Sequence, residues 1–282
     1  MSSLFINLIQ TELHKIFRKG RSYVGFGAIA FIVIVIQIAL YVDGESYLDL
    51  GTQTLKESFA FQGNLLNGYL SVYIILSSLW IHIPFLIALV AGDLIAGEAS
   101  TGTLRVLLIR PISRIQLIMA KFTAILLYVL AIVCFMAVLS LGTGLLIFGE
   151  GDLFVMRDII YVFESSDSLW RILAAFTFSF LSMSMIASMS FMFSSFVDSA
   201  QGPTITTMSI IIVFMIISSV DFSVFRAVKP FMFTTYMGAW QEFFADPVNW
   251  SKVYRAVFVL FSHIVVFLGV TLWHFNRKDI LT

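Results

Sequence analysis

Apolar runs without charge recur along the chain at about the length that a helix needs to cross the roughly 30 Å core of a bilayer. Five runs are clear, and they cover residues 23–42, 70–91, 122–148, 172–196 and 253–273. A sixth run, 205–220, is uncharged but shorter, so a span there must tilt little, thin the bilayer or be completed by surrounding protein. The pattern predicts an all-α membrane protein, with six transmembrane helices in a single transmembrane domain over residues 1–282.

The composition supports this prediction and excludes several other classes of protein. Of 282 residues, 59% are apolar and 12% are charged, which is about half the charged share of a soluble domain. The 17 basic residues are balanced by 17 acidic ones, so no excess of positive charge points to nucleic-acid binding. Cys134, the single cysteine, lies inside an apolar run. An internal disulfide and a cysteine-cluster metal site are therefore excluded.

The distribution of Lys and Arg predicts the orientation of the spans. Ten basic residues lie before the first span, between the second and third, or after the sixth, and seven lie in the alternate segments. By the positive-inside rule, both termini face the cytoplasm. No Asp, Glu, Lys or Arg lies near the middle of any span, which disfavours proton-coupled transport and voltage sensing, because both need charge there.

The first 22 residues show the periodicity of an amphipathic helix. One side carries Phe5, Ile6, Ile9, Leu13, Ile16 and Phe17, and the other carries Asn7, Thr11, His14, Lys15 and Arg18. This pattern is typical of a helix at a membrane interface with its basic side toward lipid headgroups. We expect an interface helix over 1–22, either as a tether for the first span or with a role in gating.

Aromatic residues are dense between the fifth and sixth spans. Residues 230–241 carry no charge, and the aromatic residues in and near them are Phe231, Phe233, Tyr236, Trp240, Phe243, Phe244 and Trp250. Such density suits the headgroup level of a membrane. We expect an outer re-entrant or interfacial segment that helps to cover the short fifth span. It forms either an aromatic belt or a substrate exit surface.

The fourth span has small residues four positions apart, at Ala175 and Ser179, Ser184 and Ser188, and Ser190 and Ser194. This spacing lets helix backbones approach closely and lets hydroxyl groups bond across helices. Because the small residues lie on more than one face, we expect this span to be buried among its neighbours. Its methionines could ligate copper(I), but flexible packing is the commoner use of Met.

The segment between the second and third spans has the most distinctive layout. Gly102 interrupts the helix that leaves the second span, and Thr103 is a suitable cap for a short helix with Leu104, Leu107 and Leu108. Pro111 ends that helix because it disfavours helical geometry at Arg110. Ser113 and Gln116 form a capping box that starts the next helix at Arg114. The result is a short apolar helix ringed by Arg105, Arg110 and Arg114. It is either a segment that docks into a groove of a cytoplasmic partner or an ordinary interfacial hairpin.

The string Gly97-Glu98, Gly102-Thr103-Leu104, Leu107-Leu108, Pro111, Ser113-Arg114 and Lys121 resembles the signature of the permease subunits of ABC-2-type transporters, a family of ATP-binding-cassette exporters. The resemblance implies that Glu98 is the acidic residue at the inner end of the second span. It also implies that 103–110 is the coupling helix in the cleft of an ATPase, and that 111–121 leads into the third span.

The same resemblance implies a complex in the bacterial cytoplasmic (inner) membrane, with two cytoplasmic ATPase subunits and a second permease copy or homologue. ATP and Mg would be bound by the ATPases and no cofactor by this chain, which has no G-x-x-x-x-G-K-[ST] loop. The spans favour an apolar or amphipathic cargo, such as a lipid, a peptide antibiotic or a drug. Three alternatives remain: a scaffold or sensor that does not transport, a copper or other metal permease, and an intramembrane enzyme. The last has no G-x-S-x-G elbow and no paired zinc-ligand histidines.

Overall fold

The computed structural model of the chain describes residues 2–56, 65–104, 112–157, 159–220 and 222–278. Its longer helices are α1 (Ser2–Arg18), α2 (Gly20–Lys56), α3 (Gly68–Ala91), α4 (Asp93–Ser100), α6 (Arg114–Phe148), α7 (Ser165–Phe196), α8 (Gly202–Ser219) and α10 (Trp250–Arg277). A hairpin of β1 (Leu153–Met156) and β2 (Ile160–Phe163) connects α6 to α7. Four short helical segments connect α8 to α10: η1 (Ser223–Phe225), η2 (Lys229–Phe231), α9 (Phe233–Met237) and η3 (Gly238–Phe244).

Six helical stretches in the described part of the chain are long and apolar enough to cross a membrane. They are Gly20–Ser46, Gly68–Ser100, Arg114–Phe148, Ser165–Phe196, Gly202–Ser219 and Trp250–Arg277. The predicted fold class, an all-α membrane protein with six spans, is confirmed. Most of the helices extend past the apolar runs, because a helix continues beyond the bilayer core until a cap or a turn ends it.

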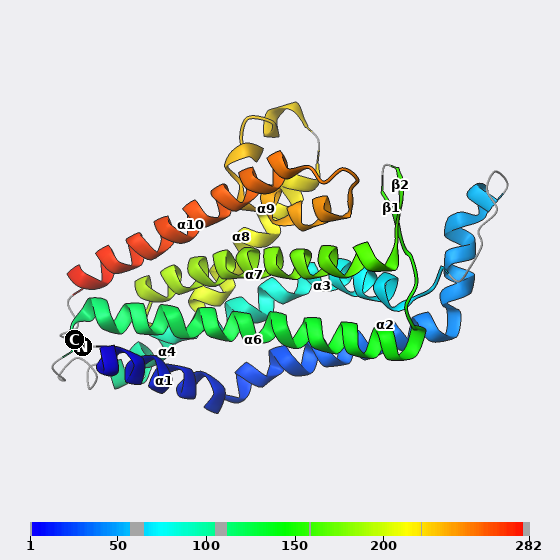
Figure 1. Cartoon of the computed structure of the whole chain (residues 1–282). Helices are drawn as coiled ribbons and strands as arrows, with labels where there is room; N and C mark the ends of the chain where they lie inside the picture. The colour runs from blue at the N-terminus through cyan, green and yellow to red at the C-terminus, as the bar shows by residue number, and fades with distance from the viewer. Residues whose placement is uncertain (1, 57–64, 105–111, 158, 221, 279–282) are drawn as a thin grey trace.

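The helices form an elongated bundle in which α7 lies among α3, α6 and α10 (Figure 1). The α7 helix is the most buried of the six spans, as its small residues predict. Hydroxyl groups bond across helices: Ser190 Oγ donates to the Ala88 carbonyl at 2.9 Å and Ser194 Oγ to the Gly92 carbonyl at 2.6 Å. The predicted role of these serines in helix packing is therefore confirmed. In contrast, α8 and α10 leave most of their apolar surface exposed.

The start of α1, the short helix α4 and the last turn of α10 lie at one end of the bundle, which we call the base (Figure 1). Arg114, the first residue of α6, joins α6 to the end of α10 at the base. Its Nη1 donates to the carbonyls of Phe275, Asn276 and Lys278 at 2.9 to 3.2 Å. The β-hairpin lies at the opposite end, which we call the top. The functional segments of the sequence analysis therefore divide between two separate ends.

The β-hairpin was not predicted. Each strand has four residues, and the two pair antiparallel with Leu153 opposite Phe163. Leu153, Phe154 and Val155 are all buried. Strands this short have too few alternating positions to show a clear period of two. Tertiary packing on the top of the bundle therefore decides that this segment is a hairpin.

The first helix forms, and five of the six residues assigned to its apolar side are buried or half-buried. Ile16 is 2% exposed, and the exception is Ile6, which is 52% exposed. Glu12, which was given no role, is also 2% exposed, because α1 packs against α6, where its carboxylate meets a lysine. The buried face of this helix therefore carries an ion pair beside the predicted apolar stripe.

The segment between α8 and α10 divides into a packed part and an exposed part. Trp240 and Phe244 are buried against Tyr73 of α3, with ring centroids 6.0 Å and 5.0 Å from the tyrosine ring. Phe222 and Phe231, by contrast, are exposed. The aromatic side chains of η3 are therefore part of the core, and the aromatic belt and the substrate exit surface both stay predictions for the exposed remainder.

Candidate functional site

The base of the bundle is built around the junction of α3 and α4. Gly92 lies at this junction, and a Cβ there would come within 2.7 Å of Thr204 Oγ1, so only glycine fits without a shift. Ser194 of α7 accepts hydrogen bonds from the backbone N–H groups of Ile95 and Ala96 at 3.1 and 2.9 Å. The Ile95 N–H belongs to the first turn of α4, where backbone N–H groups have no partner within their own helix. A side chain from a distant helix thus caps α4 and fixes its direction.

Three helices then bring four charged side chains together. Lys121 of α6 places its Nζ 2.7 Å from Glu12 Oε2 and 2.7 Å from Glu98 Oε2. Lys15 of α1 places its Nζ 2.6 Å from Glu12 Oε1 and 2.9 Å from Glu98 Oε1. The four groups alternate in sign around a closed ring, so each carboxylate touches both ammonium groups. This ring links α1, α4 and α6.

A second group of charges adjoins the ring. Asp93, at the start of α4, accepts from Lys19 Nζ at 2.5 Å and from Arg21 Nη1 at 2.7 Å. The Asp93 carboxylate lies directly over Gly97, because a Cβ at Gly97 would be 2.2 Å from Asp93 Oδ1. Glycine at this position leaves the room that the carboxylate occupies. These groups and the ring form what we call the charge cluster: Glu12, Lys15, Lys19, Arg21, Asp93, Glu98 and Lys121.

Burial makes the pairing in the charge cluster obligatory. The Lys121 side chain is 1% exposed, and a buried charge without a partner is strongly unfavourable. Burial lowers the pKa of the Lys15 ammonium, but hydrogen bonds and the charges of Glu12 and Glu98 outweigh that effect and raise its pKa above the ordinary value. Lys15 is therefore charged at neutral pH.

An open cavity of about 640 Å³ lies beside the charge cluster. Its lining residues come from α1, α2 and the residue between them, from α4 and the turn that follows, and from the connection between α7 and α8: Lys15, Arg18, Lys19, Arg21, Asp93, Gly97, Glu98, Ser100, Thr101, Thr103 and Ala200. In the part of the chain that the structure describes, no group of three His, Cys, Asp or Glu side chains has the arrangement of metal ligands. The site thus offers charges and hydroxyl groups for docking rather than a set of metal ligands.

The structure describes five of the ten residues assigned to ATPase coupling. Glu98 belongs to the charge cluster. Gly102 has a φ of 71°, which favours glycine and ends the helix as predicted. Thr103 Oγ1 donates to the Glu98 carbonyl at 3.3 Å, Leu104 is buried, and Arg114 binds the end of α10.

The other five assigned residues, Arg105, Leu107, Leu108, Arg110 and Pro111, lie outside the described residues. The predicted coupling helix over 103–110 therefore stays a prediction. The helix start that follows it is confirmed: Ser113 Oγ accepts from the Gln116 N–H at 3.2 Å, and Gln116 Oε1 accepts from the Ser113 N–H at 3.4 Å.

The charge cluster was not predicted from the sequence. Glu98 and Lys121 were named only in the resemblance and Lys15 only on the polar side of the interface helix, while Glu12 and Asp93 were given no role. One signal was present, because α6 begins at Arg114 and so includes Lys121 in an otherwise apolar helix. A lysine in that position needs a buried acidic partner.

Six long apolar helices define a multi-pass α-helical membrane protein. Within that class, the chain belongs to the family described as "Protein of unknown function (DUF2705)", whose model matches residues 28–281. A curated relative is "Uncharacterized protein YhcI" of Bacillus subtilis (strain 168), which is 29% identical over 112 residues. That match covers 38% of this chain and 36% of the length of the relative.

Proposed function

We propose that this chain is the permease subunit of an ABC-2-type exporter in the bacterial cytoplasmic membrane. In this proposal the base of the bundle and both termini face the cytoplasm. Two separate ATPase subunits bind ATP and Mg, and a second permease copy or homologue completes the translocation pathway. The chain itself is not the enzyme of the complex.

The observation that carries the proposal is the position of the charge cluster. It joins α1, α4 and α6 by ion pairs of 2.5 to 2.9 Å. Thr103, the first residue of the expected coupling helix, donates its hydroxyl hydrogen to the Glu98 carbonyl. A force applied by a partner to residues 103–111 would therefore reach three helices together, as the coupling of an ATPase to a permease requires.

The energy of transport would come from the difference in ATP affinity between two states of the ATPase pair. A change in population from 1:99 to 99:1 needs about 5.5 kcal/mol of differential binding. The permease contributes no phosphate-binding loop, so its part is to pass from inward-open to outward-open when the ATPases close. Packed helices that are joined at the base are suited to move as units between two such states.

The substrate class that we propose is apolar or amphipathic, as for a lipid, a peptide antibiotic or a drug. The charged clusters described here lie toward the ends of the helices, and α8 and α10 expose apolar surface along most of their length. A polar cargo would need hydrogen-bonding groups along its path. Apolar surface on these two helices also suits contact with lipid or with the second permease.

The test begins with the tagged full chain, extracted from its native membrane in mild detergent. We expect a stoichiometric subunit with a G-x-x-x-x-G-K-[ST] loop to co-purify and to hydrolyse ATP in a vanadate-sensitive way. The double variant Leu107→Asp with Arg110→Glu should weaken that association by about tenfold or more, because apolar and Arg anchors dominate interfaces.

The matched control is Val162→Asp, which places the same charge on an exposed apolar residue of β2 at the top of the bundle. It should leave the association unchanged. Equal association of all variants would contradict the coupling assignment. If the partner binds but reconstituted vesicles export no amphipathic cargo on addition of ATP, the scaffold or sensor function replaces the exporter.

A further inference from the structure

A second cavity, of about 570 Å³, lies toward the top of the bundle, between the β-hairpin, the short helices and the start of α10. Its volume falls within the range of small-molecule sites, about 300–1,000 Å³. Five basic side chains line it, and we call it the basic pocket: Arg157, Arg226, Lys229, Lys252 and Arg255. Glu242 is the one carboxylate among the lining residues that the structure describes.

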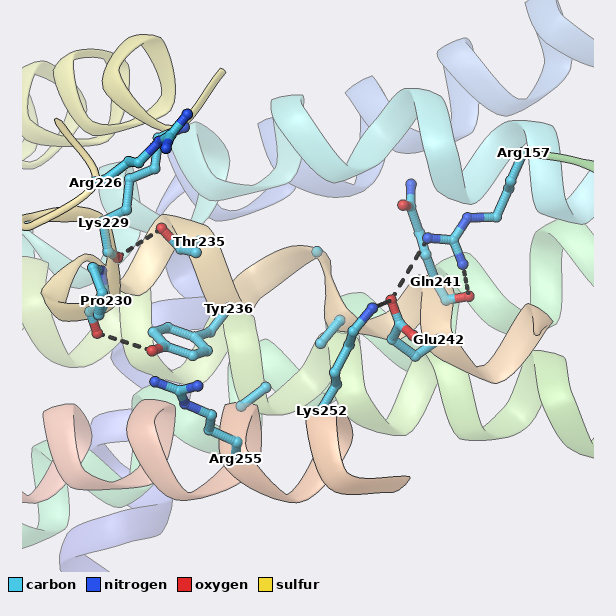
Figure 2. Close-up of a pocket in the computed structure, with 13 residues that line it drawn as sticks. Arg157, Arg226, Lys229, Pro230, Thr235, Tyr236, Gln241, Glu242, Lys252 and Arg255 are labelled. Atoms are coloured by element: carbon cyan, nitrogen blue, oxygen red, sulfur yellow. Dashed lines mark hydrogen bonds and ion pairs between the residues drawn. The ribbon is translucent and has the colours of Figure 1, made fainter. Parts of the chain in front are cut away.

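Charge is less closely balanced here than in the charge cluster. Arg157 and Lys252 share the Glu242 carboxylate at 3.6 and 3.5 Å. Figure 2 shows these three side chains at one side of the pocket, with Arg226 and Lys229 together at the other. One carboxylate offsets one of the two positive charges that it touches, so positive charge remains on that side.

Arg255 adds another cation near Tyr236. Its guanidinium carbon lies 5.9 Å from the Tyr236 ring centroid (Figure 2), and among the described residues it makes no ion pair. The Tyr236 hydroxyl donates to the Pro230 carbonyl at 2.9 Å, which holds the ring in place. The guanidinium is thus positioned by a ring rather than neutralised by an acid, and its donors remain available to an anion.

The surroundings of the basic pocket are those of a membrane headgroup layer. Trp250 and Tyr254, both exposed, stack at 5.9 Å between ring centroids on the first turns of α10, and aromatic residues of this kind gather at membrane interfaces. One turn beyond Arg255 on α10, Phe258 is 73% exposed, and Phe231 beside the pocket is 78% exposed. A bound molecule would therefore meet cations at one end and apolar surface at the other.

We propose that the basic pocket binds the phosphate group of an anionic amphiphile, which is attracted by Arg157 and Lys252 on one side of the pocket and by Arg255 beside Tyr236 on the other, with the apolar chain along α10. Guanidinium and ammonium groups are the side chains that recognise phosphate oxygens. This proposal is independent of the exporter proposal, since it concerns binding by the chain alone.

The experiment uses the purified full chain in phosphatidylcholine nanodiscs with a photoactivatable phosphatidylglycerol probe. Cross-linked peptides are mapped by mass spectrometry, and the yield at residues 226–256 is followed while unlabelled competitors are added. Phosphatidylglycerol should compete, and phosphatidylcholine should not. Competition by inorganic phosphate, at constant ionic strength, would assign the site to the phosphate group from any source, whereas its failure would assign it to a lipid-borne phosphate.

Matched variants on the same helix test the assignment. Arg255→Gln should weaken phosphatidylglycerol competition about fivefold, the effect of removing one cation near a membrane surface. Arg277→Gln is the control, because Arg277 is also an exposed arginine over an aromatic ring, with its guanidinium carbon 4.9 Å from the Trp273 centroid, but lies at the base. Its competition curve should match that of the unchanged chain.

Glu242→Gln is expected to strengthen lipid binding, which a misfolded variant would not do. Removing the shared carboxylate should strengthen phosphatidylglycerol competition about fivefold, because Arg157 and Lys252 then face the anion alone. Equal competition by phosphatidylglycerol and phosphatidylcholine would overturn the proposal. So would equal effects of Arg255→Gln and Arg277→Gln, or weaker competition with Glu242→Gln.

Discussion

The charge cluster at the base and the basic pocket toward the top are built from the same kinds of side chain, yet the charges are closely paired in the first and incompletely balanced in the second. At the base, carboxylates and cations alternate at 2.5 to 2.9 Å and most of the cluster is buried. In the basic pocket, two cations share one carboxylate at 3.5 to 3.6 Å, and the Lys252 side chain is 64% exposed. Both regions border an open cavity, so the difference lies in how closely the charges are paired. The comparison teaches that closely paired, buried charge holds helices together, whereas open and incompletely balanced charge remains available for a ligand.

The largest expected effect comes from removing one lysine at each end. Lys121→Met leaves Glu12 and Glu98 buried with Lys15 as their shared partner, and it should reduce the free energy of unfolding by about 3–5 kcal/mol. Lys252→Met removes a side chain that is 64% exposed, and it should change stability by less than about 0.5 kcal/mol. Chemical denaturation of the purified chain in detergent measures both.

The double variant Lys121→Met with Glu98→Gln serves as the control for this prediction. It removes one charge of each sign, so it should recover part of the stability lost in Lys121→Met. A loss for Lys252→Met as large as that for Lys121→Met would erase the distinction between the two regions.

A pair of glycines tests how closely the charge cluster is packed. Gly97→Ala places a Cβ where the Asp93 carboxylate lies, at 2.2 Å from its Oδ1, and should destabilise the chain by about 1–3 kcal/mol. Gly27→Ala is the control, since nothing lies within 4 Å of the new Cβ. It should be neutral or stabilise the helix by up to about 1 kcal/mol. Thermal unfolding compares the two, and an equal effect would argue against close packing around Asp93.

Salt should weaken the interactions of the exposed charges in the basic pocket more than those of the buried charges at the base. Ionic screening shortens the reach of exposed charges to about 8 Å at physiological ionic strength and to about 3 Å at 1 M. Anion binding in the basic pocket should therefore weaken about threefold between low and high salt, while the stabilisation from the buried ring changes little. Lipid competition and thermal unfolding over the same salt series provide the two readouts, and a parallel response in both would be the contrary result.

The smallest effect is on the pH dependence of stability. The pKa of Lys15 is raised in the folded chain, so its contribution is fully present below the unfolded value of 10.5 and is lost as pH rises through the higher folded value. The effect is expected to be a few tenths of a kcal/mol, because the side chain is 34% exposed. Subtracting the melting curves of Lys15→Gln from those of the unchanged chain between pH 9 and 11.5 isolates it. A stability difference that grows with pH would have the wrong sign.

Local chemistry made part of the base predictable. A capping box requires two side chains that are three residues apart, here those of Ser113 and Gln116. The end of the helix before Gly102 requires only a positive φ angle at that glycine. Both features are visible in a short stretch of sequence and both were predicted. Hydrogen bonds from Ser190 and Ser194 to another helix were predicted, but the helix that accepts them was not. Residue spacing shows that one face of a helix carries small side chains, and it does not show which helix packs against that face.

The pairing of Glu12 with Lys121 was not predictable in the same way. The two residues are 109 positions apart, and their meeting depends on how α1 is rotated against α6. Hydrophobic periodicity indicated the apolar side of α1, but it could not show that a carboxylate beside that side would be buried against a lysine. The cations of the basic pocket were counted in two separate connecting segments, and nothing local indicated that they converge.

The sequence by itself determined the number of apolar spans, the break at Gly102 and the start of the helix that contains the third span, because each depends on composition or on neighbours within a few residues. The tertiary structure alone decided which charges are closely paired and which are left incompletely balanced. The physical reason is that the free energy of a charge depends on its distance from other charges and from water. Those distances are fixed only when α1, α4, α6 and α10 have taken their places in the bundle.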